Sequence, residues 1–217
     1  MIASNRYTAA TAALVARDPV IAALAAETGP ITFDAPTESN YAALVRAITY
    51  QQLAGAAAHA IHGRLVALLD GDVVPERLAA FSPDELRAVG LSAAKAASML
   101  DLTAKALDGS VPLDDDVLAR LTDEEVVARR ITVRGIGRWT SEVFLMIHLG
   151  RPDVLPGGDL GIRKGYGLAW RVPTPTEKQL LVLGEAYRPY RSVLSWYCWR
   201  AAELYGGSTA SAVADSA

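Results

Sequence analysis

Apolar side chains recur every three or four residues along most of the chain, as they do on one face of an α-helix. Tyr41, Leu44, Val45 and Ile48 form one such set. Ser82-Pro83-Asp84-Glu85 has the order of a helix start, with a capping serine, a first-turn proline and a capping-box glutamate. Strand-like alternation is scarce and alanine is abundant, so the pattern predicts an all-α protein. Helices are expected at about residues 8–27, 40–51, 54–69, 75–81, 82–90, 92–108, 114–121, 122–131, 140–148, 159–170, 176–187 and 190–204.

Composition narrows the class of protein. Apolar residues make up 51% of the 217 positions, which is enough for a substantial core. The single cysteine, Cys198, excludes a disulfide within the chain and any metal site built from several thiolates. The N-terminus lacks a charged segment followed by an apolar run, and no run of about eighteen uncharged apolar residues occurs. We therefore expect a cytoplasmic protein that does not enter membranes.

Charge is unevenly distributed along the chain. The net charge is −3, yet residues 129–171 carry 8 basic and 3 acidic side chains. This basic segment contains Val133-Arg134-Gly135-Ile136-Gly137-Arg138-Trp139-Thr140, a tight glycine turn between two predicted helices. Such a turn offers backbone N–H groups and a helix N-terminus to an anion, and repeated phosphates are a natural partner. The same basic residues are equally compatible with ordinary solvated surface.

Several segments resemble one known superfamily. Residues 131–142 read ITVRGIGRWTSE and residues 153–159 read DVLPGGD, which resemble the signature of the helix-hairpin-helix/Gly-Pro-Asp DNA glycosylases. Residues 44–53, LVRAITYQQL, and 90–95, GLSAAK, are similar to the 3-methyladenine DNA glycosylase II family within it. The resemblance spans about residues 40–205 in the family's order. An extra N-terminal β domain seen in some members is missing, because too few residues precede position 40.

The resemblance implies a catalytic carboxylate at Asp159. Hydrolysis of a base–sugar bond in a duplex requires the nucleotide to leave the base stack, and positive charge develops on the sugar as the base departs. A carboxylate beside that sugar can stabilise the charge or orient a water molecule for attack. The alternative is that Asp159 only caps the helix beginning at Leu160, and both roles can hold together.

Aromatic residues are candidates for the base pocket. Relatives that also cut the DNA backbone place a lysine nucleophile where this chain has Trp139, so the resemblance implies a glycosylase without lyase activity. An indole face also attracts cationic alkylated purines. Tyr50 and Trp170 are further pocket candidates. Each of the three aromatics has an alternative interpretation as a packing residue.

The family also implies how DNA is held. In the family the turn at Gln52 and Leu53 inserts a side chain into the gap left by the flipped base, and a polar helix end is the alternative. A monovalent cation, Na⁺ or K⁺, is expected on the backbone carbonyls of Ile131, Val133 and Ile136. The phosphate contacts expected in the hairpin come from Arg134, Gly135, Gly137, Arg138 and Thr140.

The sequence thus predicts two helical lobes flanking a DNA-binding cleft. One lobe comprises about residues 40–150 with the hairpin at 131–142, and the other combines about 1–35 with 158–205; residues 206–217 are expected to fray. The predicted function is excision of 3-methyladenine, 7-methylguanine and related bases from double-stranded DNA, by a monomer without an organic cofactor. The alternatives are a DNA-damage binding protein that performs no chemistry and a glycosylase that also nicks the backbone.

Overall fold

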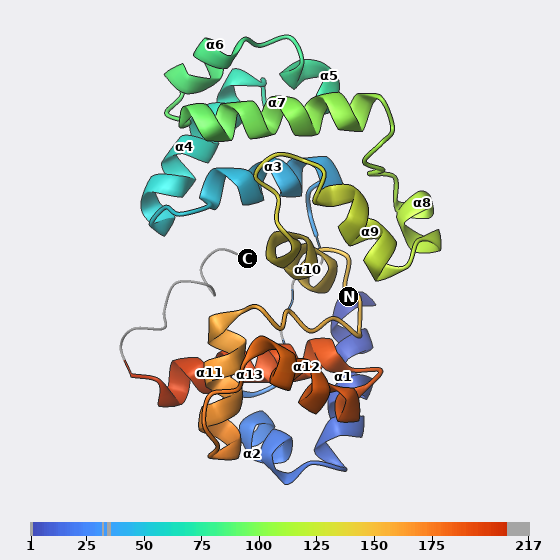
Figure 1. Ribbon diagram of the computed structural model, residues 1–217. Coiled ribbons are helices and arrows are strands. Elements are labelled where there is room, and N and C mark those ends of the chain that lie inside the picture. Colours follow the sequence, from blue (N-terminus) through green and yellow to red (C-terminus); the bar gives the residue numbers. More distant parts are fainter. Residues whose placement is uncertain (1, 32, 34–35, 208–217) are drawn as a thin grey trace. The chain divides into compact units, whose positions relative to one another are not determined.

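The computed structural model describes residues 2–31, 33 and 36–207, and it is helical wherever it has regular structure (Figure 1). The expected frayed tail lies outside the described residues from position 208 onward. Among the described helices none is long and apolar enough to cross a membrane. The helices are α1 (Ile2–Val15), α2 (Pro19–Thr28), α3 (Asn40–Tyr50), α4 (Gly55–Leu68), α5 (Pro75–Leu78), α6 (Pro83–Ala88), α7 (Ala93–Leu107), α8 (Asp115–Arg120), α9 (Asp123–Arg130), α10 (Arg138–Ile147), α11 (Leu160–Trp170), α12 (Glu177–Gly184), the 3₁₀ turn η1 (Glu185–Tyr187) and α13 (Arg191–Tyr205).

Local capping chemistry explains where these helices begin. The hydroxyl of Ser82 accepts the N–H of Glu85 while the Glu85 carboxylate accepts the N–H of Ser82, so the predicted capping box at α6 is confirmed. Thr122 and Glu125 form the same box at α9. Ser92 caps α7 by accepting the amide of Lys95.

One predicted helix is two helices. The expected helix over 8–27 breaks between Val15 and Pro19. The carboxylate of Asp18 accepts the amides of Val20 and Ile21, and Pro19 occupies the first helical position. Asp-Pro is itself a helix start signal, because the aspartate satisfies exposed N–H groups and proline has none to lose. The apolar periodicity continues across this break, so periodicity alone does not indicate that one helix ends and another begins there.

The described residues divide into two compact units, one formed by 37–141 and the other by the residues before 37 together with 142–207. The sequence predicts the end of the first lobe near residue 150, and the division in the structure falls inside α10.

In the Thr37–Ser141 unit, α7 is the central helix and packs on α3, α5 and α6. Its buried residues Met99 and Leu102 share the core with Leu44 and Ile48 of α3 and with Leu65 of α4. One polar pair is buried there: the hydroxyls of Tyr41 and Thr103 lie 2.7 Å apart, and burial raises the pKa of Tyr41 to about 12. The loop between α9 and α10, coloured yellow in Figure 1, lies against α3 and α7.

In the other unit, α13 packs on α11, α2 and α1. The approach of α11 to α13 is close because Gly165 faces the backbone of Cys198; a Cβ atom at position 165 would overlap the Cys198 carbonyl. The core of this unit comes from both ends of the sequence, including Leu14, Ile21 and Leu24 early and Ile162, Leu180, Leu194 and Tyr197 late.

Candidate active site

The turn between α9 and α10, at residues 131–138, contains both buried residues that anchor it and exposed residues. Val133 and Ile136 are buried, whereas Arg134, Gly135, Gly137 and Arg138 are exposed. Gly135 has φ +77°, a left-handed conformation that favours glycine, and a Cβ there would also collide with Ser98 of α7. The two apolar anchors therefore fix a turn whose neighbouring residues are exposed.

Side chains of α7 hold the backbone of this turn. The carboxylate of Asp101 accepts the amide of Arg134 at 2.7 Å, and Nζ of Lys105 donates to the carbonyl of Thr132 at 2.6 Å. Asp101 and Lys105 also pair with each other at 2.7 Å, one helical turn apart. Burial raises the pKa of Asp101, but the hydrogen bonds from Lys105 and Arg134 and their charges outweigh it and the pKa is lowered. The carboxylate thus stays charged while it holds the turn.

The basic residues near the turn differ in exposure. Arg138 pairs with Glu124 at the surface. Arg130 is almost completely buried, and burial lowers its pKa to about 9. Arg130 therefore does not belong to the basic surface that the sequence suggested, while Arg134 and Arg138 do.

The predicted wedge lies in the turn between α3 and α4. Gln52 has φ +57°, a left-handed conformation that non-glycine residues seldom adopt, and its side chain is exposed. Leu53 follows with 39% of its surface exposed. Tyr50 ends α3 half-buried, with its ring edge against His62 at a centroid distance of 6.0 Å. Strained backbone of this kind concentrates at functional sites.

Asp159 is the N-cap of α11 and is only 7% exposed. Its Oδ1 accepts the amide of Ile162 at 2.8 Å and the indole N–H of Trp199 at 3.2 Å. Its charge, together with burial, raises the pKa of the neighbouring Cys198 thiol, with burial the larger cause. The capping interpretation is thus confirmed as geometry, and it leaves a buried, oriented carboxylate.

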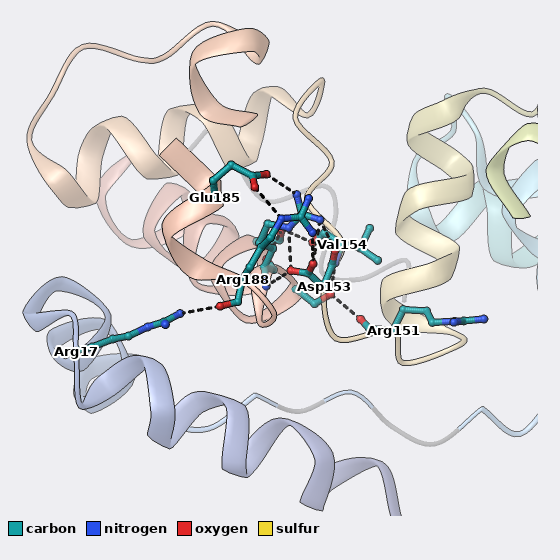
Figure 2. Close-up of polar contacts among 9 residues, drawn as sticks. Arg17, Arg151, Asp153, Val154, Glu185 and Arg188 are labelled. Carbon is teal, nitrogen blue, oxygen red and sulfur yellow. Dashed lines mark hydrogen bonds and ion pairs between the residues drawn. The ribbon is translucent and has the colours of Figure 1, made fainter. Parts of the chain in front are cut away.

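The loop that leads to Asp159 is fixed to the start of α13 (Figure 2). Nε of Arg191 donates to Oδ1 of Asp153 at 2.8 Å, and Arg188 pairs with the same carboxylate. The hydroxyl of Ser192 donates to the carbonyl of Arg151 at 2.6 Å and accepts the amide of Val154 at 3.0 Å. These bonds, far apart in sequence, hold residues 151–154 rigidly five residues before the carboxylate.

Comparison with known proteins identifies the family. The sequence profile of HhH-GPD superfamily base excision DNA repair proteins matches residues 45–187. The chain belongs to the HhH-GPD superfamily.

Alignments with relatives in the superfamily extend over most of the chain. DNA-3-methyladenine glycosylase 1 of Schizosaccharomyces pombe is 35% identical over 167 residues, which cover 76% of this chain and 73% of that protein. The solved S. pombe 3-methyladenine DNA glycosylase in complex with abasic DNA superposes with a TM-score of 0.77 at 32% identity, over 90% of this chain and 97% of that chain. The solved DNA-3-methyladenine glycosidase of Bacillus halodurans superposes with a TM-score of 0.81 at 31% identity, over 90% of this chain and 89% of that chain.

The structure does not bring Trp170 to the HhH-GPD carboxylate. Trp170 ends α11, which begins beside Asp159, so the two lie about 16 Å apart at about 1.5 Å per residue. Its ring stacks on Tyr166 with centroids 4.3 Å apart and meets Tyr187 edge-on. Trp170 therefore does not contact Asp159, and its role in the base pocket remains a prediction.

Trp199 is a tryptophan that does contact Asp159. It lies 40 positions after Asp159, and no motif or periodicity links the two residues. Only the packing of α11 on α13 brings its indole to the carboxylate. Trp139, in the other unit, is the second residue of α10 and is 42% exposed. Tyr50, Trp139, Gln52 and Leu53 remain predicted contacts.

Proposed function

We propose that this chain is a monofunctional DNA-3-methyladenine glycosylase that hydrolyses the bond between an alkylated base and deoxyribose in base excision repair. The observation that carries the proposal is the buried Asp159 carboxylate, oriented by Ile162 and Trp199, in a member of the HhH-GPD superfamily. Relatives in two organisms bear the name of this activity. The protein acts as a monomer in the cytoplasm, and 3-methyladenine and 7-methylguanine are the expected products.

Asp159 favours bond cleavage through its charge. The bond between C1′ and the base nitrogen breaks, and its electron pair leaves with the base. Water then forms the new C1′–O bond and loses a proton to solvent or to the carboxylate. Asp159 either stabilises the positive sugar or orients that water, and both roles require a charged oxygen facing C1′. Trp199 and the amide of Ile162 fix the orientation of the carboxylate in advance.

Trp139 bears on both selectivity and reaction outcome. Alkylation leaves 3-methyladenine and 7-methylguanine cationic while they are attached to DNA, and an exposed indole face attracts a cationic ring. Indole has no amine with which to form a Schiff base, so the reaction ends at an abasic site. Treatment with borohydride should therefore trap no covalent adduct between the protein and DNA.

The α9–α10 turn supplies the phosphate contacts in this proposal. Arg134 and Arg138 are exposed there beside Gly135 and Gly137, and Thr140 follows in the first turn of α10. The carbonyls of Thr132 and Gly135 accept side-chain donors from within the protein. The family resemblance implies a monovalent cation on the carbonyls of Ile131, Val133 and Ile136, where it would supply positive charge beside a DNA phosphate.

The replacement Asp159→Asn tests the catalytic assignment. Asparagine is also a good N-cap, so the fold should persist while the charge is lost. Release of 3-methyladenine from methylated duplex in a single turnover should fall by more than about 100-fold. Binding to a duplex that contains an abasic analogue should remain within a few-fold of wild type.

Asp114→Asn is the matched control, because Asp114 caps α8 in the same way. It should leave base release unchanged. Wild-type release by Asp159→Asn would contradict the catalytic role of this residue. Tight binding by the wild-type protein with no base release at all would instead support the alternative of a damage-binding protein.

A further inference from the structure

α7 fixes two separate turns that belong to the proposed DNA-binding surface. Asp101 and Lys105 hold the α9–α10 turn, as described above. On the same helix, closer to its N-terminus, Nζ of Lys95 donates to the carbonyl of Thr49 at 2.7 Å, at the C-terminal end of α3. A lysine in this position satisfies an unpaired helix-end carbonyl and opposes the helix dipole. The residues that follow Thr49 are those of the wedge turn.

A direct bond links the two turns. Nε2 of Gln51 donates to the carbonyl of Gly135 at 3.0 Å, across 84 positions of sequence. Gln51 is the C-cap of α3 and the residue immediately before the strained Gln52. Gly135 is the glycine at φ +77° in the α9–α10 turn. One hydrogen bond therefore joins the residue next to the strained Gln52 to the glycine in the left-handed conformation.

We propose that Gln51 is a positioning residue that holds the wedge turn against the backbone of the α9–α10 turn, so that the wedge is already in place when that turn binds phosphate. The inference rests on the proposed function. A wedge acts by filling the space of an extruded nucleotide, and a mobile wedge would lose entropy when it inserts. The bond from Gln51 and the bond from Lys95 remove that freedom beforehand. Arg134 and Arg138 take part in neither bond.

The replacement Gln51→Met tests this coupling, because methionine keeps the length of the side chain and removes the donor. Two dissociation constants are measured in the same buffer, one for undamaged duplex and one for duplex containing an abasic analogue. Single-turnover release of 3-methyladenine is measured in parallel. We expect undamaged duplex to bind within about twofold of wild type, while abasic duplex binds three- to tenfold more weakly and base release slows by a similar factor.

Two further variants separate positioning from general support. Asp101→Ala removes a support of the α9–α10 turn alone. It should therefore weaken binding to both duplexes by the same factor and leave the ratio of the two dissociation constants unchanged. Gln51→Lys retains a donor that can reach the Gly135 carbonyl, so it should restore the wild-type ratio of the two dissociation constants. The added positive charge affects the binding of both duplexes alike and therefore cancels in that ratio. Melting temperatures of all variants report on stability.

The outcomes are distinct. The coupling is overturned if the ratio of the dissociation constants for abasic and undamaged duplex is the same in Gln51→Met as in wild type. It is also overturned if Gln51→Lys changes this ratio as much as Gln51→Met does. Parallel weakening of both duplexes by Gln51→Met overturns it as well, because a purely structural role acts in that way. If the wild-type protein releases no 3-methyladenine, the proposed function fails, and the ratio of the two dissociation constants still decides the role of Gln51.

Discussion

In the proposed reaction, the single side chain of Asp159 serves both the fold and catalysis. As the N-cap of α11 it satisfies an amide that would otherwise lack a partner, and the same bond to Ile162 fixes its rotamer. The indole of Trp199 adds a second donor to the same oxygen. A carboxylate oriented in this way does not need to reorganise when charge develops on the sugar.

The bond from Trp199 gives a prediction at the residue scale. Trp199→Phe keeps an aromatic ring on α13 and removes the indole donor. A hydrogen bond to a charged group is worth about 1.5–3 kcal/mol, so base release should slow by at least about tenfold. Single-turnover kinetics on methylated duplex provides the measurement.

Trp196→Phe is the matched control for that variant, since Trp196 lies on the same helix and packs edge-on against Tyr197. It should leave the rate within about twofold of wild type. Equal rates in the two variants would mean that the Trp199 donor does not support Asp159.

At the scale of elements, the contact between α11 and α13 decides where Asp159 and Trp199 meet. Gly161 and Gly165 are four positions apart and face α13, toward Trp199 and Cys198 respectively. The absence of side chains at these two positions allows the helices to approach closely. The Asp153–Arg191 pair secures the preceding loop to the same helix.

Gly165→Ala should therefore separate the two helices. The new methyl group would overlap the Cys198 carbonyl, and we expect the free energy of unfolding to fall by about 3 kcal/mol. Urea denaturation measures this loss. Gly63→Ala is the control, because nothing lies within 4 Å of a Cβ at Gly63 in α4. That variant should be more stable than wild type by about 0.5–1 kcal/mol.

Local sequence predicted the elements well, because caps and apolar periodicity act between residues close in the chain. Ser82, Ser92 and Thr122 each begin a helix as expected. The single error in α1 and α2 arose where periodicity continued across the Asp18-Pro19 start signal. The sequence does not predict contacts such as that of Trp199 with Asp159, because they join residues with no regular spacing.

At the scale of the whole molecule, DNA binding has to come from a local charge pattern. The chain carries a net charge of −3, so its general field does not favour a polyanion. The exposed Arg134 and Arg138 concentrate positive charge at the α9–α10 turn. Affinity should therefore depend on a small number of phosphate contacts.

The salt dependence of duplex binding tests this expectation. Each neutralised phosphate contributes about −0.9 to the slope of log K against log salt concentration. Arg134→Ala should make that slope shallower by about 0.9, and it should weaken binding to undamaged and damaged duplexes by the same factor. Arg87→Ala removes a basic residue that pairs with Asp84 on α6, and it should leave the slope unchanged. An unchanged slope in Arg134→Ala would remove this residue from the phosphate contacts.

The sequence by itself determined the helical class, most helix boundaries, the basic glycine turn, the acid at Asp159 and an indole where a lysine would permit lyase chemistry. These properties depend on residue identity and on interactions within a few positions of the chain. Only the tertiary structure decided that Trp199 rather than Trp170 lies beside Asp159, that Arg130 is buried, and that Gln51 and α7 hold the two turns. Those contacts depend on the angle and closeness of helix packing, which apolar periodicity alone does not specify.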